Sequence, residues 1–329
     1  MNNSASILTK PMKSKQASSD STAGPRLTAL RPKVMTLSYK NKYAVMKMPN
    51  SLRALAALSL ISVLLPVGHA EEAEDKPFRP FDAPVVFQAA GPTPDSIRGT
   101  VNAFRAVPGL ETVNGNNPGP LQSGRREINW DGGNPNVLDT TVPVTPFNQF
   151  LDGRGSQFTT PGIGLTQAPA SGGPQGGLAT LFNNPTYGTI FQAFSPSRLF
   201  TPVGSNVTET LFFVPGSNGR VPATVRGFGM VFTGVDQPDG SGPGSKRGNR
   251  GASTRIEYFG QDGRLIFSSF VPASPGDGSQ SFFGIVFDDA RIARVRITSG
   301  SVAPGPDDER RKDVVVMDDF IYSEPQALR

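Results

Sequence analysis

Cysteine and histidine, two side chains on which much enzyme chemistry depends, are almost missing from this chain of 329 residues. It has no cysteine and a single histidine, His69. The lack of cysteine excludes disulfides, thiol nucleophiles and the lipidated cysteine of a bacterial lipoprotein. Beyond residue 69 the lack of histidine also excludes Ser-His-Asp triads and the usual zinc sites. An exported chain without cysteine is more typical of a bacterial envelope than of disulfide-stapled secreted domains.

The sequence also lacks an apolar run long enough to span a membrane. Its longest run covers residues 54–65, follows a short basic stretch, and is ended by Pro66. Small residues occupy positions −3 and −1 of a cut after Ala70. We therefore predict a secretory signal peptide over residues 46–70, since a spanning helix needs about 20 apolar residues. We expect export to the periplasm or outside, with no membrane span after cleavage, and residues 1–45 to be a disordered extension or a misassigned start.

The net charge changes sign once the predicted signal is removed. The full chain has 32 Lys and Arg against 27 Asp and Glu, a formal charge of +5. Residues 1–70 hold 10 of the basic residues and one acid, Asp20, which leaves 22 basic and 26 acidic residues and a net charge of −4. The basic character belongs to the targeting segment, so we expect no nucleic-acid partner.

The first part of the mature chain is rich in loop signals. Residues 71–94 are acidic and then proline-rich, which predicts a linker. Apolar residues spaced as on one helix face predict a short helix from Asp95 to Arg105, and residues 127–131 suggest one strand. We expect 95–198 to be a loop-rich layer whose phenylalanines pin it to a sheet, because disordered segments are poor in aromatics.

From residue 199 to 325 the pattern changes to short strands separated by turns. Polar and apolar residues alternate in several of these strands, as in antiparallel sheets with one wet face. The turn Gly260–Gly263 predicts a hairpin. We predict an all-β, antiparallel β-sandwich, jelly-roll-like, with 95–325 as one structural unit. The expected strands are 206–214, 224–233, 253–259, 264–271, 280–287, 291–299 and 313–322.

Several runs also resemble a known group of sequences. RGFGMVFTGVD, EYFGQDGRL, FFGIVFDDARIARVRI, DVVVMDDFIYSEP and GRREINWDG together resemble uncharacterised secreted bacterial β-sandwich proteins that end in a hydrophobic strand followed by Asp-Asp-Phe. The resemblance covers most of 95–325 and implies the same fold, but no activity. Related envelope-sorted proteins add a Pro-Glu-Pro motif, an apolar helix and a basic tail. Four residues follow Glu324-Pro325, so we expect no such sorting anchor.

Asp318 and Asp319 form the most informative pair, because they interrupt an apolar run. Neighbours in a strand point to opposite faces, so one of the two should face the core side. A buried carboxylate needs a partner. Two explanations stay open: a structural Ca²⁺, with help from Asp236 and Asp239 in a nearby loop, or hydrogen bonds from backbone N–H groups and arginines.

The lone tryptophan, Trp130, lies beside Asp131 and near Tyr187 in an expected loop-rich region. An exposed aromatic among polar residues would stack on a sugar ring, and a core position is the alternative. The first expectation is therefore an exported, non-catalytic module that binds glycan or envelope surface. The alternatives are a carboxylate-based glycan hydrolase or lyase, using residues such as Glu127, Asp131 and Glu257, and a purely structural extracellular component.

Overall fold

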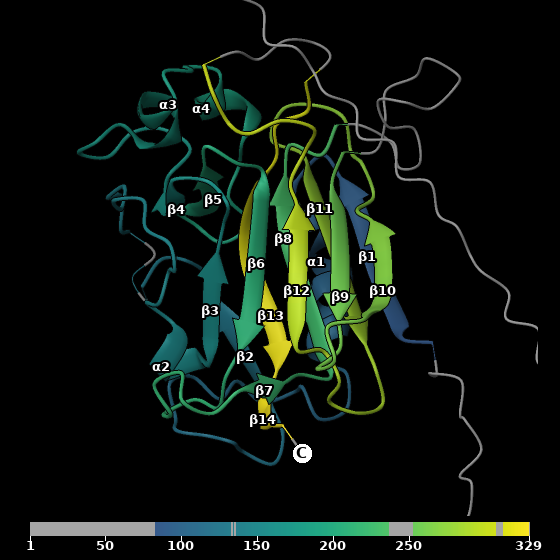
Figure 1. Cartoon of the computed structure of the whole chain (residues 1–329). Coiled ribbons are helices and arrows are strands. Elements are labelled where there is room, and N and C mark those ends of the chain that lie inside the picture. The colour runs from purple at the N-terminus through teal and green to yellow at the C-terminus, as the bar shows by residue number, and fades with distance from the viewer. Residues whose placement is uncertain (1–82, 133, 135, 237–252, 307–311, 329) are drawn as a thin grey trace, which may run out of the picture. The chain divides into compact units, whose positions relative to one another are not determined.

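Two antiparallel sheets face each other and form most of the fold (Figure 1). The computed structural model describes residues 83–132, 134, 136–236, 253–306 and 312–328, which lie within the unit Glu74–Arg329. The larger sheet has the order β1 (Val85–Gly91), β11 (Gln280–Val286), β8 (Gly227–Thr233), β13 (Val316–Ser323), β5 (Leu199–Val203) and β4 (Gly164–Ala168), and β2 (Arg125–Ile128) also pairs with β13. The smaller sheet has the order β10 (Leu265–Phe270), β9 (Arg255–Phe259), β12 (Arg294–Thr298), β6 (Val207–Phe212) and β3 (Ser156–Thr159).

This arrangement confirms the all-β prediction, and it places every expected strand in one of the sheets. β9 and β10 form the expected hairpin, in which Gly263 donates a hydrogen bond to the carbonyl of Gly260. Alternate residues of β9 and β12 are buried, as the polar–apolar alternation predicts. A small third sheet pairs β7 (Ala223–Thr224) with β14 (Gln326–Ala327). The jelly-roll connectivity stays a prediction.

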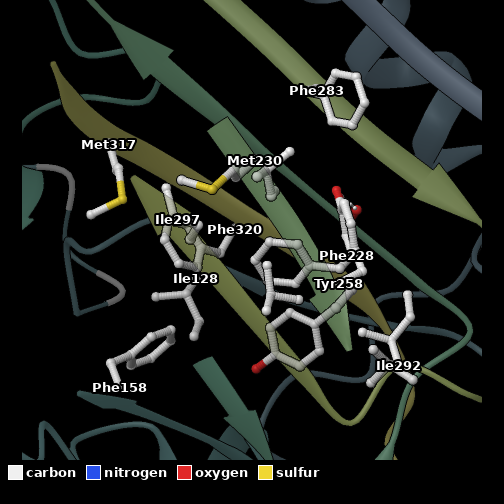
Figure 2. Close-up of a cluster of buried hydrophobic side chains, with 14 of the residues drawn as sticks. Ile128, Phe158, Phe228, Met230, Tyr258, Phe283, Ile292, Ile297, Met317 and Phe320 are labelled. Atoms are coloured by element: carbon white, nitrogen blue, oxygen red, sulfur yellow. Dashed lines mark hydrogen bonds between the residues drawn. The ribbon is translucent and has the colours of Figure 1, made fainter. Parts of the chain in front are cut away.

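The main core lies between the two sheets (Figure 2). The larger sheet contributes side chains such as Phe228, Met230 and Phe320, and the smaller sheet contributes Tyr258 and Ile297. All five side chains are fully buried. Because one face of each sheet points inward, alternate residues of β8 supply this core, while their neighbours face the other way.

The helix α1 (Pro94–Arg105) covers the outer face of the larger sheet. Its stripe of Ile97, Val101 and Phe104 is buried, as its spacing predicts. Gly229 and Gly284 lie opposite each other on β8 and β11 and leave room for the ring of Phe104. A Cβ at Gly284 would lie 3.0 Å from Phe104 Cε2, so glycine here sets how closely the helix approaches the sheet.

The part before residue 199 is more regular than its composition predicts. β1 lies within the segment 71–94, which we predicted to be a linker, because β11 offers it a complete row of backbone partners. β3 and β4 each extend a sheet, and three short helices accompany α1: α2 (Leu151–Arg154), α3 (Gly177–Leu181) and α4 (Tyr187–Ile190). Sequence periodicity misses such elements, since their stability comes from tertiary pairing.

Some predictions concern parts of the chain that the structure does not describe. The extension 1–45, the signal peptide 46–70 and Asp239 lie outside the described residues. Within the described part of the chain, no helix is long and apolar enough to cross a membrane.

Candidate functional site

Trp130 lies in the core rather than on the surface. Its side chain is fully buried, and its ring stacks on Phe200 with centroids 3.7 Å apart and planes 3° from parallel. The indole meets four further phenylalanine rings edge-on: Phe147, Phe150, Phe158 and Phe320. No face of the indole is therefore open to a sugar. Trp130 occupies a core position, which is the second of the two roles that its sequence context suggests.

Trp130 also has an unusual backbone conformation, with φ of 64°. A non-glycine residue in the left-handed region costs about 1–3 kcal/mol and persists only where its surroundings hold it there. The five surrounding rings hold the indole, and the next residue, Asp131, anchors the backbone. The chain reverses here between β2 and the loop that follows, which brings Asn129 and Gly132 to the surface.

Asp131 is fully buried and serves as a backbone anchor. Its Oδ1 accepts hydrogen bonds from the N–H groups of Ser197, at 2.9 Å, and Arg198, at 2.8 Å. Burial raises the pKa of Asp131, while these two bonds oppose the rise. Tyr187 is buried in a different cluster, where its hydroxyl bonds the backbone of Gly305. The structure therefore does not gather Trp130, Asp131 and Tyr187 into one exposed ligand site.

Asp318 and Asp319 are both buried on the outer face of the larger sheet. A bulge shifts the pairing of β13 with β8 between Asp318 and Phe320, so two consecutive residues oppose one. Both carboxylates consequently reach Ser195: its N–H donates to Asp318 Oδ2 at 3.2 Å, and its hydroxyl donates to Asp319 Oδ1. The expectation that the pair would split between two faces is wrong, because strict alternation does not hold across a bulge.

Two arginines and the half-buried Glu127 complete this polar cluster. Arg105, the last residue of α1, donates to both oxygens of Glu127, at 2.9 and 3.1 Å, and to Asp319 Oδ2 at 3.1 Å. Arg125 donates a further hydrogen bond to Glu127. Burial is the main cause that raises the pKa of Asp318 and Asp319, and the negative charge of Asp319 raises that of Asp318 further.

The bonding of the aspartate pair matches the second of the two explanations that the sequence left open. All four carboxylate oxygens accept hydrogen bonds from protein donors: backbone N–H groups, Ser195 and Arg105. Within the described residues no group of three or more His, Cys, Asp or Glu side chains could hold a metal ion. Asp236 is exposed, and its Oδ1 accepts a hydrogen bond from the N–H of Gly276 at 3.0 Å.

A smaller cleft opens at the surface next to Trp130. It has a volume of about 410 Å³ and lies between the end of β2 and the helix α2. Its wall includes the half-buried ring of Phe150, which packs edge-on against Trp130 with centroids 5.7 Å apart. The polar side chains that line it are Asn116, Glu127, Asn129, Gln149, Asp152 and Arg154.

Arg154 is the most distinctive of these polar groups. Its Nε is buried and has no hydrogen-bond partner among the described residues. Burial is the main cause that lowers the pKa of Arg154; the charge of Arg126 adds to this effect, while Tyr322 and Glu127 oppose it. A buried N–H without an acceptor costs about 1–3 kcal/mol.

The sequence pattern points to Trp130 and Asp131, but not to the two residues that form the surface of the cleft. Trp130 and Asp131 are the support beneath the smaller cleft, while Phe150 and Arg154 supply its surface. Phe150 was visible in the sequence only as one of several spaced phenylalanines. No sequence pattern marks Arg154, because the burial that leaves its Nε without a partner among the described residues is created by segments distant in the sequence. Comparisons with protein-family models, with curated proteins and with solved structures found no match.

Proposed function

We propose that this protein is an exported, non-catalytic module that binds a glycan of the cell envelope in the smaller cleft. The observation that carries the proposal is that one cleft is lined both by the half-buried ring of Phe150 and by Arg154, whose Nε has no partner among the described residues. Sugar rings present an apolar face, which packs on aromatic rings, and a rim of hydroxyls, which bind planar polar side chains.

The polar residues around Phe150 suit hydroxyl groups rather than a strong charge. Asn116, Asn129 and Gln149 are exposed amides, each able to donate and accept hydrogen bonds. The two acids of the cleft are already engaged: Glu127 binds two arginines, and Asp152 Oδ1 accepts a hydrogen bond from the N–H of Asn218 at 2.9 Å. The half-buried carboxylate of Glu127 already interacts with the charge of Arg154, so the cleft favours a neutral saccharide over an anion.

A glycan array probed with the purified protein tests the proposal. Phe150→Ala and Arg154→Gln should each weaken binding to any glycan that scores by about tenfold, since each removes one principal contact. Arg220 is exposed and lines neither cleft, so Arg220→Gln is the matched control and should bind like the wild type. A blank array would remove the proposal and favour the purely structural alternative.

Trp130 offers an independent readout, because it is the single tryptophan of the chain. It lies directly behind Phe150, so a glycan that packs on Phe150 should change the intrinsic fluorescence. A glycan that binds without altering the emission would contradict the assignment to the smaller cleft.

A glycan hydrolase is the second candidate, because two carboxylates, Glu127 and Asp152, line one cleft. An assay for new reducing ends with any glycan that binds decides between the two. Activity that disappears in Glu127→Gln would establish the hydrolase, whereas bound but uncleaved glycan supports the non-catalytic module.

Export is part of the proposal and depends on the signal-peptide pattern of residues 46–70. Sequencing the N-terminus of protein recovered outside the cytoplasm should give Glu71 as the first residue. Recovery of the protein only in the cytoplasm, with residues 46–70 intact, would contradict it.

A further inference from the structure

A larger cleft, of about 770 Å³, lies at the C-terminal end of β13, where Ser323 and Glu324 line it. It is formed where β7 and β14 meet the turn of the β9–β10 hairpin and the loop before β12, near the C-terminus in Figure 1. Its lining has no aromatic side chain, but it contains the three arginines Arg226, Arg264 and Arg291. Its recognition chemistry must therefore differ from that of the smaller cleft.

Arg226 is fixed at this cleft by its own backbone. Its N–H donates to Ser323 Oγ at 2.8 Å, and its carbonyl accepts a hydrogen bond from the N–H of Phe287 at 2.8 Å. The residue joins β7 to β8, so its position depends on both the larger and the two-stranded sheet. Such a residue presents its guanidinium with little freedom of the main chain.

The guanidinium of Arg226 has no anionic partner within the described part of the chain. None of the ion pairs found there involves Arg226. Its Nε is buried and lacks a hydrogen-bond acceptor among the same residues. The other two arginines differ, because Arg264 pairs with Asp262 and Arg291 pairs with Asp289.

Four acids line the larger cleft, and three of them, Asp262, Asp288 and Asp289, lie at its exposed rim. The side chains of Asp262 and Asp289 are 54% and 63% exposed. Glu324 also lines the cleft, but both of its oxygens bind Arg126 at 2.6 Å. Water screens the rim charges, whereas a half-buried guanidinium acts in a lower dielectric. An anionic group that reaches Arg226 therefore gains more there than it loses at the rim.

We propose that the larger cleft binds a sugar acid, whose carboxylate pairs with Arg226 while its hydroxyls donate to the rim aspartates. A planar carboxylate matches the fork of a guanidinium, and its single negative charge balances the single positive charge of Arg226. A doubly charged phosphate would be repelled more strongly by the acids of the rim. The hydroxyl groups of a sugar acid can donate to the exposed carboxylates of the rim. This site is independent of the neutral glycan proposed for the smaller cleft.

Calorimetric titration of the purified protein tests this site with three probes: D-glucuronate, D-glucose and acetate. We expect D-glucuronate to bind at least tenfold more tightly than either of the others, because only it combines the carboxylate with a ring of hydroxyls. Binding should leave the fluorescence of Trp130 unchanged, since Trp130 does not line this cleft. Equal affinity for glucuronate and glucose, or for glucuronate and acetate, would overturn the proposal.

Variants locate the contact. Arg226→Gln should lower the affinity for D-glucuronate at least tenfold, and Arg226→Lys should lower it less, because lysine keeps the charge but not the fork. Arg220→Gln, at an exposed arginine outside the cleft, and Phe150→Ala, in the smaller cleft, should bind glucuronate like the wild type. Because Phe150 lines only the smaller cleft, glucuronate binding that survives Phe150→Ala tests the larger cleft independently of the glycan proposed for the smaller one.

Thermal melting of each variant shows whether it is folded. A folded Arg226→Gln protein with wild-type affinity would contradict the proposal. If that variant does not fold, the comparison of the three probes on the wild-type protein decides by itself.

Discussion

Asp131 and Asp318 bind opposite ends of one short segment, Phe194–Arg198, which connects α4 to β5. Asp318 Oδ2 accepts hydrogen bonds from the N–H groups of Phe194, at 2.6 Å, and Ser195, at 3.2 Å. Asp131 Oδ1 accepts those of Ser197 and Arg198. The carboxylate of Asp318, in β13, and that of Asp131, in the loop after β2, thus serve as the acceptors that these backbone N–H groups lack within the loop. They fix the start of β5 against both β13 and the loop that supports the smaller cleft.

Asp131→Ala should destabilise the protein by about 2–3 kcal/mol, since it leaves two backbone N–H groups without their acceptor in a buried place. Asp131→Asn should cost less, because an amide oxygen can replace Oδ1, and Oδ2 has no partner among the described residues. Urea denaturation measures both changes. The control is Asp277→Ala, at an exposed side chain, which should stay within about 0.5 kcal/mol of the wild type. Equal losses for Asp131→Ala and Asp277→Ala would contradict the anchoring role.

The stability of the protein should decrease as pH rises above the usual aspartate pKa of 3.8, through the titration of Asp318. Burial raises the pKa of Asp318 in the folded state, so the folded protein holds this proton more tightly than the unfolded chain does. Asp318→Asn removes the titration. The free energy of unfolding of the wild type, relative to this variant, should therefore fall as pH rises from 4 to 7.

The test is how the difference in free energy of unfolding between the wild type and Asp318→Asn changes with pH. The absolute size of that difference is not informative, because the asparagine amide makes other hydrogen bonds with the backbone N–H groups than the carboxylate does. Asp277→Asn, at an exposed position, gives the baseline for the removal of one carboxylate. A difference that stays constant across the range would show that Asp318 does not titrate there.

Gly284→Ala should destabilise the protein by about 1–3 kcal/mol through overpacking. The added Cβ would lie 3.0 Å from Phe104 Cε2 and 3.0 Å from the Cα of Gly229, so α1 would have to move away from the sheet. Gly99→Ala is the matched control on α1, where an added Cβ meets nothing within 4 Å. That substitution should be neutral or stabilising, by up to about 1 kcal/mol, because alanine favours the helix. In thermal denaturation, the midpoint of Gly284→Ala should fall clearly below that of the wild type, while that of Gly99→Ala should stay the same or rise.

Trp130 should be shielded from iodide in the folded protein. The indole is fully buried among five phenylalanine rings, and it is the single tryptophan of the chain. Fluorescence quenching should therefore be weak under native conditions and strong in urea. Strong quenching of the native protein would indicate that the ring is exposed, as the initial sugar-stacking expectation requires.

If the aspartate pair is the only candidate site for a structural calcium ion, removing calcium should leave the thermal midpoint of the protein unchanged, because the pair is already fully hydrogen-bonded. Every carboxylate oxygen of Asp318 and Asp319 already accepts a hydrogen bond from the protein, so an ion would have to displace these donors. Melting curves with EDTA and with millimolar calcium test this. A calcium-dependent shift that disappears in Asp319→Asn would place the ion at the pair. A shift that disappears in Asp239→Asn would place it in the loop.

The elements that depend on local pattern were predictable from the sequence. The helix stripe of Ile97, Val101 and Phe104 and the alternation in β9 and β12 both follow from the geometry of one element. β1 and β4 were missed, since each is held in place by a partner strand distant in sequence. The Asp318–Asp319 pair was predicted to be important, but the bulge that turns both carboxylates toward Ser195 has no local signature.

The sequence by itself determined the all-β class, most strands of the second half, and the absence of thiol and, beyond His69, of histidine chemistry, because these depend on composition and short-range periodicity. Only the tertiary structure decided the two clefts and their arginines. Arg154 and Arg226 resemble any other arginine in the sequence. Each has a buried Nε without a partner in the described part of the chain, and this property arises from burial. Burial is created when segments far apart in the chain pack together, and so no local pattern carries it.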